Sequence, residues 1–280
     1  MKTILVIANQ TLGGAKLLEA VKEKVDAADG DARVVIAVPR VAPRHGTIIY
    51  DDAVFGAAQV RIDLASSFLR EAGISAIGEV GDPDPYTATM DAIGEHHPDE
   101  VVVSTLPTTS SGWLRRDLVE RIRDACGLPV EHVVIDLQAE GLPFKVTLVV
   151  ANRTAATDDL LAHLDKLASE GEERRLFIAC VPQEGGDGSA SALARSRLAQ
   201  IIDRIQSEGH LAAGIVGDPD PYTAVMNALE LFRVDDIVIS TLPATRSMRS
   251  ARSQPERVAG SVEMTMSSTW KSSRAFITAV

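Results

Sequence analysis

Short apolar runs alternate with stretches of helical spacing along most of the chain. Thr3–Ala8 is typical of a buried strand, and the apolar positions in residues 17–25 that follow it fall at helical spacing. The alternation continues, and four more strands are predicted at Val34–Val38, Ile74–Val80, Val101–Ser104 and Val130–Ile135. Strands that alternate with helices predict right-handed crossovers and a parallel sheet with helices on both faces.

The same order of elements starts again after residue 145. Strands are predicted at Val146–Ala151, Leu176–Val181, Ala212–Val216 and Asp236–Ile239, with apolar positions at helical spacing between them. The segment that joins the two sets contains Gly141 and Pro143, which interrupt regular structure. We therefore expect two α/β domains, residues 1–138 and residues 145–243.

The two domains are copies of one ancestral sequence. Gly81–Ala88 recurs as Gly217–Ala224, and Ser104–Pro107 recurs as Ser240–Pro243, both at an offset of 136. Across these two stretches and the residues between them, 16 of 27 positions are identical. A match of this length indicates an internal duplication.

The correspondence ends at Pro243. Residues 244–280 contain six Lys and Arg, twelve Ser and Thr, and no sustained apolar period. We interpret this tail as a departure from the ancestral repeat, such as a reading-frame shift would leave, and predict it to be disordered or partly ordered. The alternative is a diverged terminal helix and strand, with Phe276–Val280 pairing as a short strand.

Composition narrows the class of protein. Aromatic residues make up only 4% of the chain, so the cores are built from Val, Ile, Leu and Ala, which suits buried parallel strands. The net charge of −11 argues against a general nucleic-acid or anionic-membrane binder. Cys126 and Cys180 are too few for a disulfide framework, and core packing is expected for both. Apolar runs too short for a signal peptide or a membrane span predict a cytoplasmic protein.

Polar residues follow the predicted strands where a parallel sheet binds its ligands. In such sheets the ligand lies outside the carboxyl ends of the strands, where the strand order reverses. Asn9 follows the first strand, Asp82 the third, and Ser104 ends the fourth, before a loop rich in Ser and Thr. Such a loop at a helix N-terminus offers N–H groups and a favourable dipole to phosphate. Ser and Thr are also ordinary N-caps, so both interpretations stay open.

The repeated Asp-Pro-Asp-Pro segment also has two interpretations. Each proline pushes the preceding Asp into extended geometry, which makes the segment a rigid loop. In the structural interpretation, Asp84 and Asp220 cap the helices that begin at the next proline. In the functional one, Asp82 and Asp218 bind a ribose hydroxyl, or a metal that bridges to phosphate, because a bare carboxylate would repel phosphate.

Known catalytic patterns are not found in the sequence. It holds no Ser-His-Asp set, paired-carboxylate motif, Walker loop or nucleophile elbow, so we expect a binding protein and neither an enzyme nor a metal site. His96 and His97 precede Pro98 at a predicted helix end. We expect them to form a solvated C-terminal cap without nearby metal ligands.

The order of elements, the duplication and the loop after the fourth strand resemble the universal stress protein family, most of all its tandem two-repeat members. The resemblance covers about residues 1–138 and 145–243. It implies two Rossmann-like domains of the adenine nucleotide alpha hydrolase-like fold, each with a five-stranded parallel sheet of order 3-2-1-4-5, the second with an atypical C-terminal end. It also implies adenine-nucleotide binding in one subset of members, and dimerisation through the last strand.

The chain departs from the nucleotide-binding subset at two motifs. That subset has an Asp at the end of the first strand, where this chain has Asn9 and Asn152. The subset also has a Gly-rich phosphate loop after the fourth strand. This chain has Ser104–Gly112 there, with one Gly, and Ser240–Ser247 in the second repeat, with none. Asn can still hydrogen-bond a ribose or a base, and Ser and Thr can still contact phosphate.

Three hypotheses of function follow. The first is a stress-type sensor whose repeats form an intramolecular pseudo-dimer, with a homodimer as a further expectation, and bind ATP with or without Mg²⁺. The second is a nucleotide-free interaction or dimerisation module, and the third is a nucleotide-hydrolysing or adenylyl-transferring enzyme that uses Asp82 or Asp218 to hold a metal. For the first hypothesis, the residues predicted to contact the nucleotide are Ala8, Asn9, Gln10, Thr11, Val38, Gly81, Asp82, Ser104, Thr105, Thr109, Ser110, Ser111, Gly112, Ala151, Asn152, Arg153, Gly217, Asp218, Ser240 and Thr241.

Overall fold

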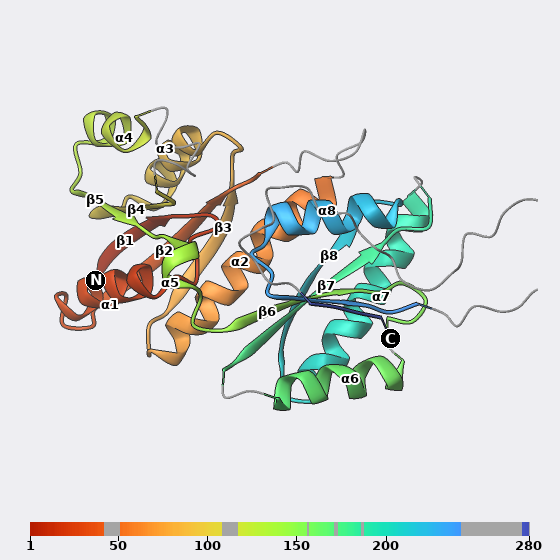
Figure 1. Ribbon diagram of the computed structural model, residues 1–280. Coiled ribbons are helices and arrows are strands. Elements are labelled where there is room, and N and C mark those ends of the chain that lie inside the picture. The colour runs from red at the N-terminus through yellow and green to blue at the C-terminus, as the bar shows by residue number, and fades with distance from the viewer. Residues whose placement is uncertain are drawn as a thin grey trace, which may run out of the picture.

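The chain folds around two parallel β-sheets, one in each repeat (Figure 1). The structure is a computed structural model, and it describes residues 1–41, 51–107, 117–155, 157–170, 173–185, 188–241 and 276–279. Helices cover both faces of each sheet, as the alternation of strands and helices predicts. Among the described residues, no helix is long and apolar enough to cross a membrane.

The first sheet has the order β3-β2-β1-β4-β5, which confirms the predicted order for the first repeat. Every neighbouring pair of its strands is parallel. The strands are β1 (Lys2–Ile7), β2 (Ala32–Pro39), β3 (Ala76–Gly81), β4 (Glu100–Thr105) and β5 (Val130–Val134).

Helices on both faces of the first sheet explain why its strands read as continuous apolar runs. Ile4 and Val6 of β1 lie in the core on one face, whereas Leu5 and Ile7 lie in the core on the other. The first face is covered by α1 (Ala15–Asp26) and α2 (Asp51–Glu71), and the second by α3 (Pro85–His96) and α4 (Leu118–Cys126). The short helix α5 (Leu137–Glu140) leads toward the second repeat.

The second sheet has the order β10-β9-β6-β7-β8. From β8 to β10 this is the same order as in the first sheet from β3 to β5. Its strands are β6 (Lys145–Val150), β7 (Arg175–Pro182), β8 (Leu211–Gly217), β9 (Asp236–Ile239) and β10 (Phe276–Ala279), and its helices are α6 (Asp158–Ser169), α7 (Gly188–Ser207) and α8 (Pro221–Leu231). The tail meets the sheet at β10, where Phe276 pairs with Asp236 in a parallel ladder. The rest of the predicted tail lies outside the described residues.

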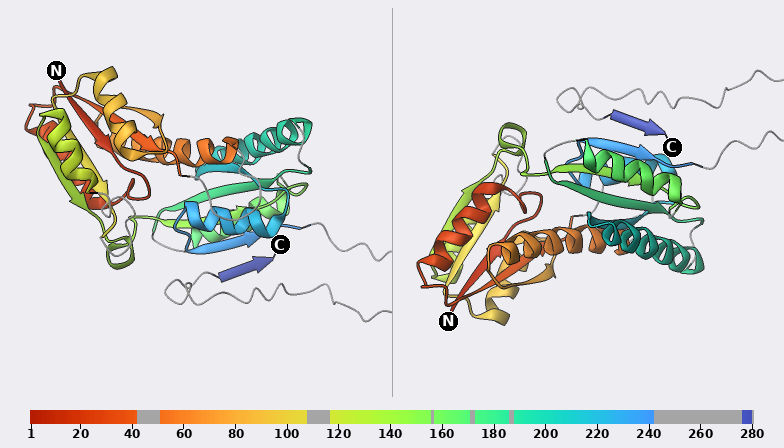
Figure 2. Two further views of the ribbon diagram at one scale, coloured as in Figure 1. Left: turned by 90° about the horizontal axis from the view of Figure 1, so that it is seen from above. Right: turned by 90° about the horizontal axis from the view of Figure 1, so that it is seen from below.

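Helix α2 belongs to both repeats in its packing. Ile62 and Leu69 lie in the core of the first sheet, whereas Val60 lies in the core of the second. Phe68 of α2 also stacks on Phe144 of the linker, with ring centroids 5.1 Å apart. Figure 2 shows α2, in orange, extending from the first sheet to the second in both views. Within the described ranges the repeats therefore meet through α2, and the last strands β5 and β10 lie in separate sheets instead of pairing with each other.

Two glycines show that α2 and α7 occupy equivalent positions on their sheets. A Cβ at Gly78 would lie 1.9 Å from Cγ2 of Ile62 in α2, and a Cβ at Gly214 would lie 2.6 Å from Cδ1 of Leu198 in α7. The repeat offset of 136 relates both the two glycines and the two helix residues. It also makes Arg61, which precedes Ile62, the counterpart of Arg197.

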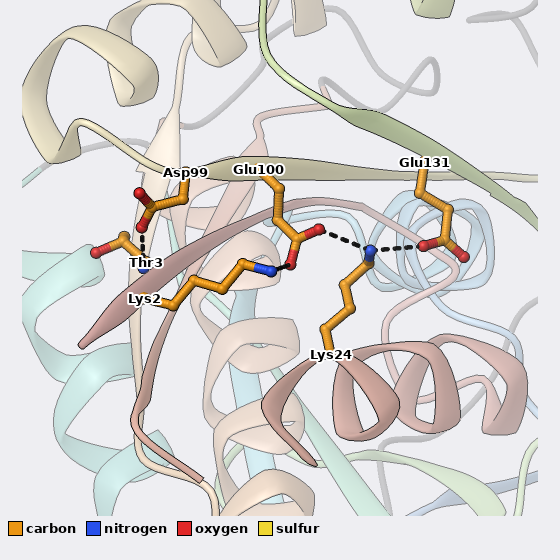
Figure 3. Close-up of polar contacts among 6 residues, drawn as sticks. All are labelled: Lys2, Thr3, Lys24, Asp99, Glu100 and Glu131. Carbon is orange, nitrogen blue, oxygen red and sulfur yellow. Dashed lines mark hydrogen bonds and ion pairs between the residues drawn. The ribbon is translucent and has the colours of Figure 1, made fainter. Parts of the chain in front are cut away.

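A polar network holds the amino edge of the first sheet (Figure 3). The carboxylate of Glu100 on β4 is paired with Nζ of Lys2 at 2.8 Å and Nζ of Lys24 at 2.9 Å, and Lys24 also meets Glu131 on β5 at 2.8 Å. Burial raises the pKa of Glu100, but hydrogen bonds from Lys2 and Lys24 and their charges outweigh it, so this pKa lies below its usual value. The network ties α1 to β1, β4 and β5 at the edge opposite the candidate site.

The second repeat keeps a related arrangement at its amino edge. The backbone N–H of Thr3 donates to Asp99 Oδ2 at 2.7 Å, and that of Val146 donates to Asp235 Oδ2 at 2.8 Å. Asp236, the counterpart of Glu100, is paired with Arg175. The amino edges of the two sheets are therefore alike in design.

Candidate functional site

The candidate site lies at the carboxyl edge of the first sheet, between β1 and β4. These neighbouring strands are followed by connections on opposite faces, which is the point where open parallel sheets bind ligands. Asn9 and Thr11 come directly after β1, and Ser104 lies near the end of β4. Sequence reasoning placed all three at this edge.

Three side-chain oxygens at this edge are buried and lack a partner within the described ranges. Asn9, Thr11 and Ser104 are 6%, 2% and 1% exposed. Asn9 Nδ2 donates to the carbonyl of Pro39 at 2.7 Å, which fixes the amide so that Oδ1 is left over. Among the described residues, which do not include 108–116 after β4, Asn9 Oδ1, Thr11 Oγ1 and Ser104 Oγ have no hydrogen-bond partner. Buried polar atoms are nearly always satisfied in folded proteins, so these three atoms make this edge the candidate site.

Helix α1 begins beside these oxygens. Its N-cap, Gly14, provides no side-chain cap, and no acidic residue lies in its first turn. A Cβ at Gly14 would lie 2.8 Å from Cδ1 of Ile135, so the chain packs too closely here for a larger N-cap residue. The uncapped N–H groups and the helix dipole favour an anion at this end of α1.

At the matching edge of the second repeat, the equivalent side chains are hydrogen-bonded to other groups of the protein. Asn152, the counterpart of Asn9, accepts a hydrogen bond from Arg197 of α7 through Oδ1. Thr154, the counterpart of Thr11, donates to the carbonyl of Ser240 at 3.0 Å. Helix α6 also begins with Asp158 and Asp159, whose charges disfavour an anion at its N-terminus.

Charged side chains close the second edge further. Glu184 pairs with Arg153 at 2.7 Å and with Arg197 at 3.2 Å. The hydrogen bond from Arg153 holds the pKa of Glu184 below its usual value. Arg153 and Asn152 were both predicted to contact nucleotide, but here they take part in a network within the protein. Sequence analysis overlooked Arg197, although aligning α7 with α2 at the repeat offset would have paired it with Arg61.

The Asp-Pro-Asp-Pro segments are capped turns in both repeats. Asp84 Oδ2 accepts from the N–H of Thr87 at 3.1 Å, and Asp220 Oδ2 accepts from that of Thr223 at 2.9 Å. The predicted capping role of Asp84 and Asp220 is therefore confirmed. Asp82 Oδ1 accepts from the N–H of Asp84 at 2.8 Å, and Asp218 repeats this contact in the second turn at 2.9 Å. The nucleotide contact of Asp82 and Asp218 stays a prediction.

Two predicted site glycines have a packing role. A Cβ at Gly81 would lie 2.8 Å from Cβ of Ala88, and one at Gly217 would lie 2.9 Å from Cβ of Ala224. Only glycine lets the helix that follows approach the end of β3 or β8 so closely. Cys180 lies within the same packing at Gly217, and burial raises the pKa of its thiol to about 12, as suits a core cysteine.

The remaining predicted residues are placed in different ways. Ala8, Val38 and Ala151 are buried in the cores, so only their backbone is available to a ligand. Gln10 Nε2 donates to the carbonyl of Glu230 at 3.0 Å, across to the second repeat, and Thr105 Oγ1 lies 2.8 Å from Nε2 of His132. Ser240 and Thr241 follow β9. Four further predicted residues lie outside the described residues: Thr109, Ser110, Ser111 and Gly112.

His96 differs from the prediction of a solvated cap without nearby ligands. His97 is the C-cap, but His96 Nε2 lies 2.8 Å from Glu79 Oε2, and Glu79, Glu95 and His96 could hold a metal between them. Helix α3 brings His96 and Glu95 next to β3, a contact that the sequence did not reveal. Nη2 of Arg33 lies 3.4 Å from His96 Nδ1, and this positive charge disfavours a cation at the cluster.

Comparison with solved structures finds universal stress proteins. The chain is similar to a universal stress protein from Archaeoglobus fulgidus DSM 4304, with 16% identity, a TM-score of 0.36, and 85% of each chain covered. It is also similar to a universal stress protein in complex with cAMP, with 20% identity, a TM-score of 0.33, and 47% of this chain and 96% of that chain covered. No protein-family model and no curated protein matches the chain.

Proposed function

We propose that the protein is a stress-type sensor that binds one adenine nucleotide at the carboxyl edge of its first sheet. The observation that carries the proposal is the group of buried oxygens on Asn9, Thr11 and Ser104, for which the described part of the chain offers no partner, beside the uncapped start of α1. Asn9 Oδ1 can accept a hydrogen bond from a ribose hydroxyl or the adenine amino group, and the two hydroxyls can donate to phosphate. The dipole of α1 adds a favourable field for the phosphate charge.

The proposal assigns different roles to the two repeats. In the second repeat Arg197 and the carbonyl of Ser240 already satisfy the groups equivalent to Asn9 and Thr11. A nucleotide there would have to break these contacts and lie close to Asp158 and Asp159. We therefore propose one nucleotide per chain, with the second repeat acting as a pseudo-dimer partner through α2, in a cytoplasmic protein that binds without turnover.

The test is a calorimetric titration of ATP, with and without Mg²⁺, into full-length protein freed of bound nucleotide. AMP and cAMP serve as further probes, cAMP because one similar solved structure is a complex with it. The expected result is saturable binding with a stoichiometry of one. Two sites per chain would contradict the asymmetry between the repeats, and no heat and no thermal shift at millimolar nucleotide would contradict nucleotide binding itself.

The second candidate function is a nucleotide-free interaction module of the same fold. The closed edge of the second repeat favours it, because Asn152 and Arg153 show how this fold fills the position without a ligand. A titration without any nucleotide binding would leave this function as the better supported one.

A further inference from the structure

A cavity of about 210 Å³ lies between the two repeats, apart from the nucleotide edge. Its floor is the face of the second sheet, where Val146, Leu176 and Ile178 lie. Helix α2 supplies one wall, and the C-terminal end of α8 supplies another. Phe144 of the linker contributes to the lining, which is therefore largely apolar.

A buried cation lines this cavity. Arg61 of α2 is 6% exposed, and its guanidinium donates to the carbonyls of Ala57, at 3.3 Å, and Leu231, and lies over the ring of Phe232. Burial lowers the pKa of Arg61 to about 10, so it keeps its charge at neutral pH. Among the described residues no carboxylate pairs with it. The C-terminal carbonyls of α8 compensate part of the charge, but a buried guanidinium has five N–H groups to satisfy.

A second guanidinium adds to this charge. Arg233 also lines the cavity, and its Nη1 is buried with no hydrogen-bond partner in the part of the chain that the structure describes. One carboxylate, that of Glu230, belongs to the lining as well, and Glu230 has a further interaction within the protein. Two guanidinium groups against one carboxylate leave an excess of positive charge beside an apolar floor.

We propose that this cavity binds a small amphipathic monocarboxylate, with its carboxylate between Arg61 and Arg233 and its apolar body on the floor of the second sheet. Arginine is the side chain best suited to hold a carboxylate through two parallel hydrogen bonds. A dry cavity of roughly 150 Å³ holds benzene, so this one suits a molecule of the size of benzoate or octanoate.

The cavity and the nucleotide edge share one loop. Gln10 and Leu12 line the cavity. Asn9 and Thr11, which alternate with them along the chain, lie at the nucleotide edge. The carboxylate site does not depend on the nucleotide site, because Arg61 and Arg233 are not among the groups proposed to hold the nucleotide. Its binding is therefore measured without nucleotide, and either proposal can fail while the other holds.

The test is a calorimetric titration of benzoate and octanoate into the full chain, with benzamide as the neutral match for benzoate. Arg233→Gln removes one charge, and Leu229→Trp fills the cavity from a partly buried position on α8. Arg70→Gln, an exposed charge change on α2, is the matched control. Circular dichroism and the melting temperature report whether each variant is folded.

The expected result is saturable binding of both carboxylates to the natural chain, with benzamide weaker by about tenfold or more. Arg233→Gln weakens benzoate by about tenfold, Leu229→Trp removes binding, and Arg70→Gln leaves it unchanged. The proposal is overturned if neither carboxylate binds at millimolar concentration, or if benzamide binds as well as benzoate. Those two outcomes need no variant, so a variant that fails to fold leaves the proposal open to refutation.

Discussion

The carboxyl edges of the two sheets started as copies and now differ in how their polar groups are satisfied. At the first edge, Asn9 and Thr11 have oxygens that no described residue pairs with, whereas at the second edge Asn152 and Thr154 are hydrogen-bonded within the protein. The difference comes from the arginines on two equivalent helices, Arg61 on α2 and Arg197 on α7. Arg197 reaches the edge of its own sheet, but its counterpart Arg61 donates to the carbonyl of Leu231 in the other repeat.

Packing between duplicated domains can thus change the hydrogen bonding of an Asn and a Thr that both repeats retain. Helix α2 lies between the sheets and directs Arg61 toward α8, so the first edge loses the arginine that closes the second. Asn152 Oδ1 therefore accepts a hydrogen bond from an arginine, and Asn9 Oδ1 does not. At the amino edges of the two sheets, the backbone N–H groups of Thr3 and Val146 still donate alike to Asp99 and Asp235.

The largest expected effect is on the Glu100 network at the amino edge of the first sheet. Glu100→Gln removes the buried carboxylate from Lys2 and Lys24 and should lower the free energy of unfolding by about 2 kcal/mol, because Lys2 loses its carboxylate partner and Lys24 keeps only Glu131. Urea unfolding at neutral pH measures this. Lys16→Gln, which removes an exposed charge on α1, should change stability little and is the control.

The difference in stability between the natural chain and Glu100→Gln should also depend on pH. The folded-state pKa of Glu100 lies below its unfolded value of about 4.3, so its contribution is present above that pH and is lost as the pH falls through the folded value. The gap in stability between the natural chain and Glu100→Gln should therefore shrink below about pH 4. A gap that stays constant down to acid unfolding would show that Glu100 acts through packing and not through its charge.

A smaller effect is expected from opening the second edge. Arg197→Met leaves Asn152 Oδ1 and Glu184 without a partner from α7 and should lower the free energy of unfolding by about 1.5 kcal/mol. The number of nucleotides bound should stay at one, because Asp158 and Asp159 still disfavour phosphate at α6. A second site appearing in Arg197→Met would show that the arginine alone keeps nucleotide out.

The N-cap of α8 should make a moderate contribution to stability. Asp220→Ala removes the acceptor for the N–H and the hydroxyl of Thr223 and should cost about 1 kcal/mol, measured by thermal unfolding. The backbone hydrogen bond from Thr223 lowers the pKa of Asp220, so this loss should fade in acid as the carboxylate protonates. Asp220→Asn, which keeps an acceptor, should retain most of the stability, and equal losses in both variants would argue against capping.

The smallest expected effects have opposite signs at the two carboxyl edges. Thr11→Val replaces a buried hydroxyl, to which no described residue is hydrogen-bonded, by a methyl group and should raise the free energy of unfolding, without nucleotide, by about 0.5–1 kcal/mol. Thr154→Val loses the hydrogen bond to the carbonyl of Ser240 and should lower it by about 1 kcal/mol. Denaturant midpoints of the two variants decide this, and a shift in the same direction would remove the distinction between the edges.

Much of the architecture could be predicted from local sequence. Apolar runs such as Val101–Ser104 mark strands buried on both faces, and Asp84 followed by Pro85 marks a helix start, because capping and proline geometry are decided within a few residues. The duplication then carries each assignment to the other repeat.

The partners of α2 and the state of each edge could not be predicted in this way. Val60 and Ile62 are both apolar, and nothing local says that they face different sheets. Asn9 and Asn152 occupy the same place in the repeat, and which of them is satisfied depends on an arginine more than 40 residues away from Asn152 in the chain. Such contacts depend on tertiary packing, which no periodicity encodes.

The central claim is that the first edge binds nucleotide and the second does not. The most direct measurement is an ATP titration of Thr11→Val and Thr154→Val side by side with the natural chain. We predict about tenfold weaker binding in Thr11→Val and unchanged affinity in Thr154→Val, both with one site per chain. Equal affinities in all three proteins, or a loss confined to Thr154→Val, would contradict the claim.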